Sequence, residues 1–132
     1  MIKGVLFQEE LCKDPFWMLV ACVLVNRTKW KQAEPVFEKL RAKYVTSENL
    51  AKEKPANLFD VVKILGFGNS RAISLPRMAQ DYIRIDPIYS DEIPRLHGCG
   101  KYAADSWAIF VEGRRDVEPT DVELKGWLEK HE

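Results

Sequence analysis

The chain has 132 residues, of which 46% are hydrophobic and 30% charged, as expected of one soluble globular domain with a single core. Its 20 lysines and arginines balance its 20 aspartates and glutamates, so the net charge lacks the basic excess common in nucleic-acid-binding proteins. The apolar run Met18–Val25 is too short to span a bilayer, and the N-terminus lacks the long apolar stretch of a signal peptide. We therefore expect a single intracellular domain over residues 1–132 that has no membrane partner.

The first predicted elements are helices joined by short connectors. Asp14-Pro15 is typical of a helix start, with an N-cap residue before a proline at the first helical position. The apolar residues that follow predict a buried central helix from Phe16 to about Asn26. Apolar residues spaced three and four apart predict a second helix over Trp30–Tyr44. Thr46-Ser47 is expected to cap a short helical turn.

The middle of the chain predicts two further helices. Pro55 opens the first of them, and Gly66 ends it. Asn69-Ser70 is expected to cap the second, in which Pro76 predicts either a kink or a later start. A turn is expected at Asp86-Pro87.

The last third of the chain predicts two helices around a glycine-containing hairpin, near residues 90–112, and one final helix. The hairpin helices are Ser90–Arg95 and Lys101–Glu112, and Gly113 stops the second. The pattern Thr120-x-x-Glu123 is a capping box, which places Asp121 in the first turn of the final helix. We therefore expect an all-α fold, a compact helical bundle with a pocket that faces Asp121.

The hairpin contains Gly98-x-Gly100 between its two helical segments. Glycines allow a tight turn and a close approach to a ligand. The free N–H groups at the start of the Lys101 helix can then bind a phosphate oxygen. An ordinary helix–helix turn has the same pattern, so the glycines alone do not decide between these interpretations.

The longer stretch LHGCGKYAAD, residues 96–105, resembles the hairpin of the helix-hairpin-helix base-excision DNA glycosylases. In that superfamily an essential aspartate follows the second hairpin helix at a similar spacing, and here Asp121 lies 19 positions after Tyr102. Within the superfamily, the chain resembles the glycosylase domain of the methyl-CpG-binding mismatch (thymine/uracil) glycosylases over nearly its whole length. The motifs that carry this resemblance are Gln8-Glu9-x-Leu11-x-x-Asp14-Pro15, Leu24-x-Asn26-Arg27-Thr28, Leu65-Gly66 with Arg71-Ala72, the hairpin, and Pro119-x-Asp121.

The resemblance implies the reaction chemistry. Asp121 is expected to stabilise the positive charge that develops on the sugar as the N-glycosidic bond breaks, and to orient the attacking water. Tyr102 stands where bifunctional relatives have a lysine that forms a Schiff base, so we expect an abasic product and no lyase step. Lys101 lies one position away on the helix and is expected to contact a phosphate.

The resemblance also implies how the base is reached. Gln8 and Tyr102 are expected to line a pocket for the flipped pyrimidine, whose Watson–Crick edge is the same in thymine and uracil. Arg27 is expected to enter the vacated base stack, and a surface phosphate contact or a solvated arginine is the alternative. Phe67 is expected either to wedge into the opposite strand or to be a core residue at a helix end.

The cysteines Cys12, Cys22 and Cys99 contain no C-x-x-C pair, so we expect buried free thiols and no iron–sulfur cluster. By resemblance, the carbonyl oxygens of Leu96 and Cys99 hold a structural Na⁺ or K⁺ that takes no part in catalysis. His97 is expected to pack or to form hydrogen bonds, because no second ligand lies at metal-binding spacing.

These predictions describe a monomeric, monofunctional glycosylase that excises thymine or uracil mispaired with guanine from double-stranded DNA. A nuclear location is expected in a eukaryote, and a cytoplasmic or nucleoid one otherwise. The alternatives are a glycosylase of the same scaffold for another damaged base, a non-catalytic helix-hairpin-helix DNA-binding module, or a small helical interaction domain. Glu123 departs from the family, in which a basic residue is usual, and a negative charge there would weaken phosphate contact.

Overall fold

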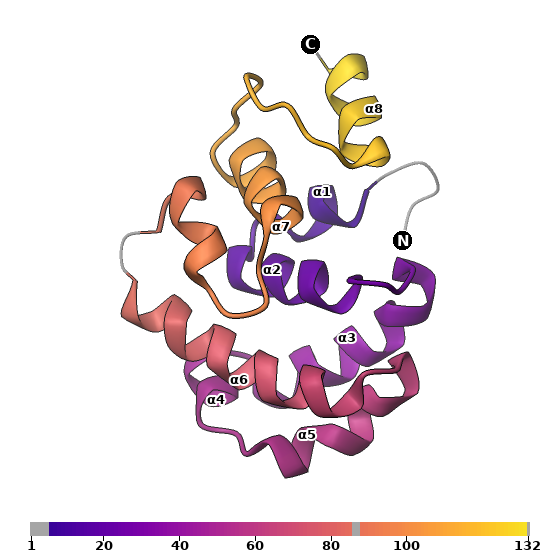
Figure 1. Cartoon of the computed structure of the whole chain (residues 1–132), viewed down its shortest axis with the longest axis vertical. Coiled ribbons are helices and arrows are strands. Elements are labelled where there is room, and N and C mark those ends of the chain that lie inside the picture. The colour runs from indigo at the N-terminus through magenta and orange to yellow at the C-terminus, as the bar shows by residue number, and fades with distance from the viewer. Residues whose placement is uncertain (1–5, 86–87, 132) are drawn as a thin grey trace.

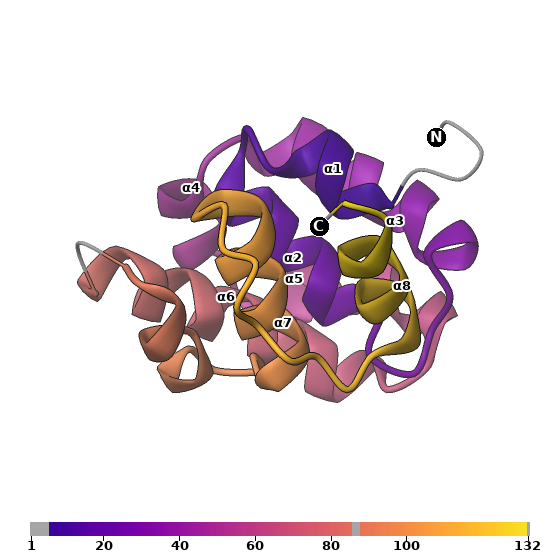
Figure 2. The same ribbon diagram turned by 90° about the horizontal axis from the view of Figure 1, so that it is seen from above.

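A computed structural model describes residues 6–85 and 88–131, which form helices and helical turns without a strand (Figure 1). The all-α prediction is therefore confirmed. The α-helices are α1 (Phe7–Leu11), α2 (Pro15–Leu24), α3 (Trp30–Tyr44), α4 (Ser47–Ala51), α5 (Pro55–Val62), α6 (Gly68–Arg84), α7 (Lys101–Ser106) and α8 (Val122–Lys130). Figure 1 shows α2 across the middle, with α3 to α6 below it and α1, α7 and α8 above it. In the view from above, α1, α7 and α8 surround α2 (Figure 2).

The central helix is α2, as the sequence predicts. Every residue from Phe16 to Leu24 is buried, because α2 packs against α1, α3, α6 and α7. A helix that is apolar all round can serve as a core for elements on each of its sides. None of the helices in the described part of the chain is long and apolar enough to cross a membrane.

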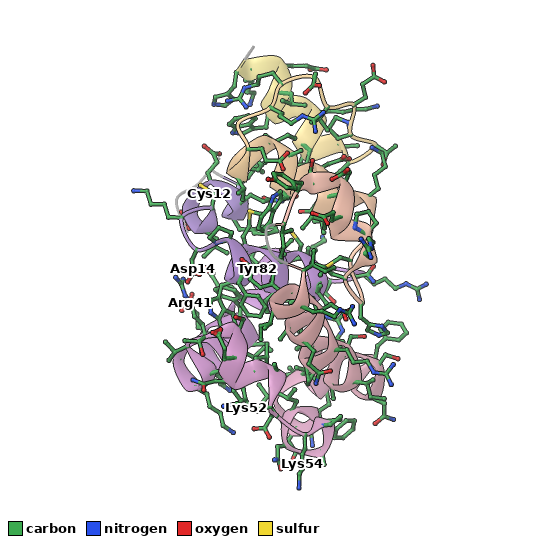
Figure 3. All side chains as sticks on the ribbon, turned by 90° about the vertical axis from the view of Figure 1, so that its left-hand side faces the viewer. Cys12, Asp14, Arg41, Lys52, Lys54 and Tyr82 are labelled. Carbon is green, nitrogen blue, oxygen red and sulfur yellow. The ribbon has the colours of Figure 1, made fainter. Side chains whose placement is uncertain are left out.

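Asp14 is the N-cap residue of α2 and Pro15 its first residue, as the sequence predicts, but the Asp14 side chain forms no cap hydrogen bond. Its carboxylate accepts no hydrogen bond from a helix amide. It pairs instead with Arg41 on α3, whose Nη2 lies 3.1 Å from Asp14 Oδ2, and Figure 3 shows the two side chains together. A charged donor is a stronger partner for a carboxylate than a neutral amide, so the ion pair replaces the cap.

The next three helices agree with the sequence. α3 covers the predicted Trp30–Tyr44. Thr46 caps α4, since its Oγ1 accepts a hydrogen bond of 3.2 Å from the Asn49 amide. α5 begins at Pro55, continues as the 3₁₀ turn η1 (Lys63–Leu65) and ends at Gly66, whose φ is +80°.

α6 differs from the prediction at its start. It begins at Gly68, so Asn69 and Ser70 lie inside its first turn, and the N-cap residue is Phe67, which makes no side-chain cap. The helix continues through Pro76, so of the two predicted alternatives the later start is wrong, and the kink stays a prediction. α6 can begin this early because it packs along α4 and α5, and tertiary packing outweighs local capping preference. The turn predicted at Asp86-Pro87 lies outside the described residues.

α1 was not predicted from the sequence. It has only five residues, which is too short for a periodic pattern to stand out. Its residues Phe7 and Leu11 lie one turn apart and are both buried, and the Phe7 ring stacks on Trp30 with 4.7 Å between centroids. Packing on the core therefore stabilises a helix that would be unstable alone.

The hairpin helices form where they are predicted. The 3₁₀ turn η2 (Ser90–Arg95) precedes the hairpin and packs against α7, and α7 continues as the π-helical turn η3 (Trp107–Val111). A small second cluster of Ile109, Leu124 and Leu128, with Tyr102 packed against it, attaches α8 to this unit. The hairpin and α8 are thereby held side by side.

Candidate active site

A cavity of about 780 Å³ opens where the hairpin, the loop after α2 and the start of α8 meet. Most of the site residues predicted from the sequence line it, namely Arg27, Gly98, Cys99, Gly100, Lys101, Tyr102 and Asp121. The predicted pocket facing Asp121 is therefore present. Gln8 and Phe67 do not line the cavity.

Asp121 is itself the N-cap residue of α8, so its predicted place in the first helical turn is wrong. Its backbone is extended (φ −70°, ψ 130°), and its Oδ2 accepts a hydrogen bond of 3.0 Å from the Leu124 amide. The predicted cap, Thr120, is exposed. Oδ1 has no hydrogen-bond partner among the described residues. The helix therefore orients the carboxylate through one oxygen and leaves the other available.

Tyr102 connects the cavity to a buried polar network. Its hydroxyl oxygen accepts a hydrogen bond of 2.7 Å from Gln8 Nε2, which also lies 3.2 Å from Ser106 Oγ. Burial, and then the neighbouring acidic groups, raise the pKa of Tyr102 far above its usual value. The phenol therefore stays protonated at every physiological pH and can donate a hydrogen bond into the cavity, but it cannot act as a base.

Gln8 is buried, with only 1% of its surface exposed. The sequence predicted that it lines the base pocket, and the structure places it next to Tyr102, outside the cavity wall. Its Oε1 is buried and has no partner among the described residues. A buried unpaired carbonyl is costly, so a further donor at this amide would stabilise the site.

Lys101 makes contacts that the sequence did not suggest. Its Nζ lies 2.9 Å from Asp105 Oδ2 and donates to the Glu118 carbonyl oxygen at 3.1 Å. Asp105 is buried, and Glu118 lies in the segment that leads to Asp121. Lys101 therefore connects α7 to the segment that precedes Asp121. Its contact with a phosphate stays a prediction.

The two hairpin glycines have different roles. Gly98 has a φ of +83°, a conformation that favours glycine, whereas Gly100 is extended and a Cβ there would meet nothing within 4 Å. Gly100 therefore leaves the backbone open to a ligand on the cavity side.

The hairpin turn is closed by the Leu96 carbonyl, which accepts a hydrogen bond of 3.0 Å from the Cys99 amide. Cation binding by the Leu96 and Cys99 carbonyls stays a prediction. No group of three metal-binding His, Cys, Asp or Glu side chains occurs within residues 6–85 and 88–131.

Arg27 and Phe67 contact one another at the surface. The Arg27 guanidinium lies over the Phe67 ring, 5.2 Å from its centroid. Phe67 is 57% exposed, so the alternative that it is a core residue at a helix end is wrong. Both residues have a positive φ, +66° for Arg27 and +53° for Phe67, a conformation that costs a non-glycine residue about 1 kcal/mol or more.

Sequence reasoning assigned no role in the site to three residues that belong to it. Cys22 lines the cavity from α2, and burial raises the pKa of its thiol to about 12. Ser106 completes the Gln8 network. Arg71 is buried beside the loop that carries Arg27. The sequence could have indicated it, because Arg71 lies one turn before Leu75 and so places a charged residue on the apolar face of α6.

The structure combines an all-α fold, a glycine hairpin and an oriented carboxylate that lines the same cavity as the hairpin. This is the architecture of a helix-hairpin-helix DNA-repair enzyme. The sequence profile of the HhH-GPD superfamily of base excision DNA repair proteins matches residues 20–131. The chain therefore belongs to this superfamily, a family of DNA glycosylases that act on DNA.

Individual relatives agree with this assignment. The Methyl-CpG-binding domain protein 4-like protein of Arabidopsis thaliana is 32% identical over 117 residues, which are 88% of this chain and 26% of that protein. Endonuclease III of Thermotoga maritima is 32% identical over 96 residues, 70% of this chain and 45% of that protein. The solved structure of a thermostable thymine-DNA glycosylase superposes with a TM-score of 0.70 at 25% identity, over 77% of this chain and 49% of the other. The chain thus spans between about a quarter and a half of the length of these proteins.

Proposed function

We propose that the protein is a monofunctional DNA glycosylase that removes thymine or uracil mispaired with guanine and leaves an abasic site. The observation that carries this proposal is a pair of residues that line the same cavity, an oriented carboxylate at Asp121 and a phenol, in place of an amine, at Tyr102. A phenol forms no Schiff base with the sugar, so the strand stays intact after the base is lost.

In the proposed reaction the C1′–N bond breaks and its electron pair leaves with the base. Positive charge develops on the sugar, and the Asp121 carboxylate stabilises it electrostatically. Water then adds to C1′, with Asp121 orienting it and accepting its proton. The bond between Oδ2 and the Leu124 amide holds the carboxylate in one orientation, so little reorganisation is needed during the reaction.

The base is proposed to be read by hydrogen bonds to its Watson–Crick edge. Tyr102 offers its O–H, and Gln8 orients that hydroxyl through the bond of 2.7 Å. Because Gln8 lies outside the cavity wall, its direct contact with a base requires Tyr102 to turn aside. Thymine and uracil present the same edge, so both are proposed substrates.

The proposed partner is double-stranded DNA bound by a monomer, in the nucleus of a eukaryote or the nucleoid of a prokaryote. Arg27, Lys29 and Lys101 place positive charge around the cavity, and Glu123 opposes it. Phosphate contacts of this kind should make binding weaken steeply as salt is added.

The test is a single-turnover assay on labelled duplexes that contain T·G, U·G, T·A or U·A pairs. Strand breaks are measured before and after alkali, which cleaves abasic sites. We expect breaks only after alkali, only at the mismatches, and only when Asp121 is intact, so Asp121→Asn serves as the control.

Breaks without alkali would contradict the monofunctional assignment and would mean that an amine, with Lys101 the nearest one in the sequence, reaches the sugar. Equal excision from T·A and T·G would contradict the mismatch specificity. Salt-sensitive duplex binding with no base released from any of the four would contradict the proposed substrates and would favour a DNA-binding module or another damaged base.

A further inference from the structure

Arg71 has a buried guanidinium that the proposed reaction does not use. It stands in the first turns of α6 and is only 6% exposed. It donates three hydrogen bonds, to the Leu24 carbonyl at 2.6 Å, to the Asn26 carbonyl at 2.8 Å and to Thr28 Oγ1 at 2.8 Å. No ion pair joins it to a carboxylate of the described residues, so the chain segment 24–28 satisfies the charge.

The acceptors of these bonds surround Arg27. Leu24 is the last residue of α2, and Asn26 and Thr28 are the two neighbours of Arg27 in the chain. Arg27 itself is exposed and has a left-handed backbone, with a φ of +66°. A residue in this conformation persists only where its surroundings hold it. Arg71 supplies this restraint, because its planar guanidinium binds the chain on each side of Arg27.

The same turn of α6 also places Phe67. The Arg71 amide donates to the Phe67 carbonyl at 2.9 Å, and the Phe67 ring lies under the Arg27 guanidinium, 5.2 Å from it. Arg71 therefore contacts, through its side chain and its amide, the two segments that present Arg27 and Phe67. The two exposed side chains and their two strained backbones form one unit.

We propose that Arg71 is a positioning residue that holds the segment 24–28 against α6, so that Arg27 and Phe67 meet a DNA duplex as a preorganised pair. This proposal rests on the proposed function, in which Arg27 fills the space left by a flipped base. A loop ordered in the free protein loses little entropy when it inserts, so the ordering cost is met during folding and not during binding.

Arg71→Lys is the decisive variant, because it keeps the charge but loses the fork that reaches three acceptors. Arg77→Lys, at an exposed position of the same helix, is the matched control. The first measurement is amide hydrogen exchange of residues 25–29 in the free protein. We expect exchange to accelerate roughly tenfold in Arg71→Lys, as for the loss of about one charge-assisted hydrogen bond, and to stay unchanged in Arg77→Lys. Unchanged exchange in Arg71→Lys would overturn the proposal.

The second measurement compares affinity for a duplex with a stable abasic analogue opposite guanine and for the intact duplex. The preference for the abasic duplex over the intact one should fall about tenfold in Arg71→Lys. The double variant Arg27→Ala/Arg71→Lys should show the same preference as Arg27→Ala. An additive loss in the double variant would show a general structural role and overturn the proposal. A wild-type protein that excises mismatched bases but binds the two duplexes equally would overturn the proposal and leave the proposed function standing, because Arg27 would then not fill the space left by the base. A protein that excises nothing but shows the exchange and affinity effects would refute the proposed function and leave the positioning role standing.

Discussion

The N-cap position of Asp121 leads to a prediction that separates its structural role from its chemical one. Asparagine and aspartate cap helices about equally well, because each has a side-chain oxygen that can accept from the N3 amide. Asp121→Asn should therefore keep the bond to Leu124, and Asp121→Ala should lose it. α8 is attached to the rest of the protein through the buried Leu124 and Leu128, so a weakened start of this helix should lower the stability of the whole fold.

The expected magnitudes differ for the two properties. Loss of the cap in Asp121→Ala should lower the free energy of unfolding by about 1 kcal/mol. In a protein of this size that corresponds to a fall in melting temperature of roughly 3–5 °C. Both variants lose the carboxylate, and removal of one preorganised electrostatic group slows a reaction by about 10²- to 10³-fold. Asp121→Asn should thus be as stable as the wild type but slower by this factor, and Asp121→Ala should be both less stable and slower.

The assay combines calorimetric melting with single-turnover excision of uracil from a U·G duplex. Glu129→Gln, at an exposed position of α8, removes one carboxylate without touching the cap and should leave the melting temperature and the rate unchanged. If Asp121→Asn melts as low as Asp121→Ala, the capping argument is wrong. An Asp121→Asn protein with a wild-type rate would refute the assignment of the acid.

Three further predictions concern other parts of the structure. Lys101→Met should lower the free energy of unfolding by about 1 kcal/mol, because the buried Asp105 loses its cation, although the lysine is half exposed and solvent weakens the pair. An unchanged urea midpoint would mean that the pair with Asp105 contributes nothing to stability. The hydrogen bond of 2.6 Å from Tyr44, and then those from Asn57 and the Lys54 amide, lower the pKa of Glu53 from its usual 4.5 to about 2. This stabilisation is complete above pH 4.5 and is lost as the pH falls toward 2. The urea midpoint of Glu53→Gln should therefore decline less steeply over that range than the midpoint of the wild type. An equally steep decline in the variant would contradict the role of Glu53. Burial raises the pKa of the Cys22 and Cys99 thiols to about 12, so iodoacetamide at about pH 8 should add one group to the native protein, at the half-buried Cys12. The number of added groups is measured by intact mass, and rapid addition of two or three groups would contradict the burial of Cys22 and Cys99.

Much of the fold could be predicted from local patterns. The residues of α2 are apolar on every side, and those of α3 repeat at helical spacing, so hydrophobic burial alone predicts a central helix and its neighbour. The hairpin glycines and Asp121 were identified as one site because their types and spacing match a family. The cavity that contains them both agrees with that identification.

The errors occur where two local signals compete or where a partner lies far away in the sequence. Thr120 and Asp121 are both good N-cap residues, so the sequence by itself does not decide between them. In the structure Asp121 is the cap, because its backbone is extended and its side chain accepts from the Leu124 amide. Asp14 occupies the predicted N-cap position, but its carboxylate pairs with Arg41 on another helix, a contact that the local pattern does not reveal.

The sequence by itself determined the helices other than α1, the hairpin and the chemical types of the residues around the cavity, because these depend on composition and spacing along the chain. Only the tertiary structure decided which groups contact one another. It joined Gln8 to Tyr102, Lys101 to Glu118, and Arg71 to the segment around Arg27. The physical reason is that a hydrogen bond depends on tenths of an ångström between atoms, and for residues far apart in the chain that distance is set by how the helices pack.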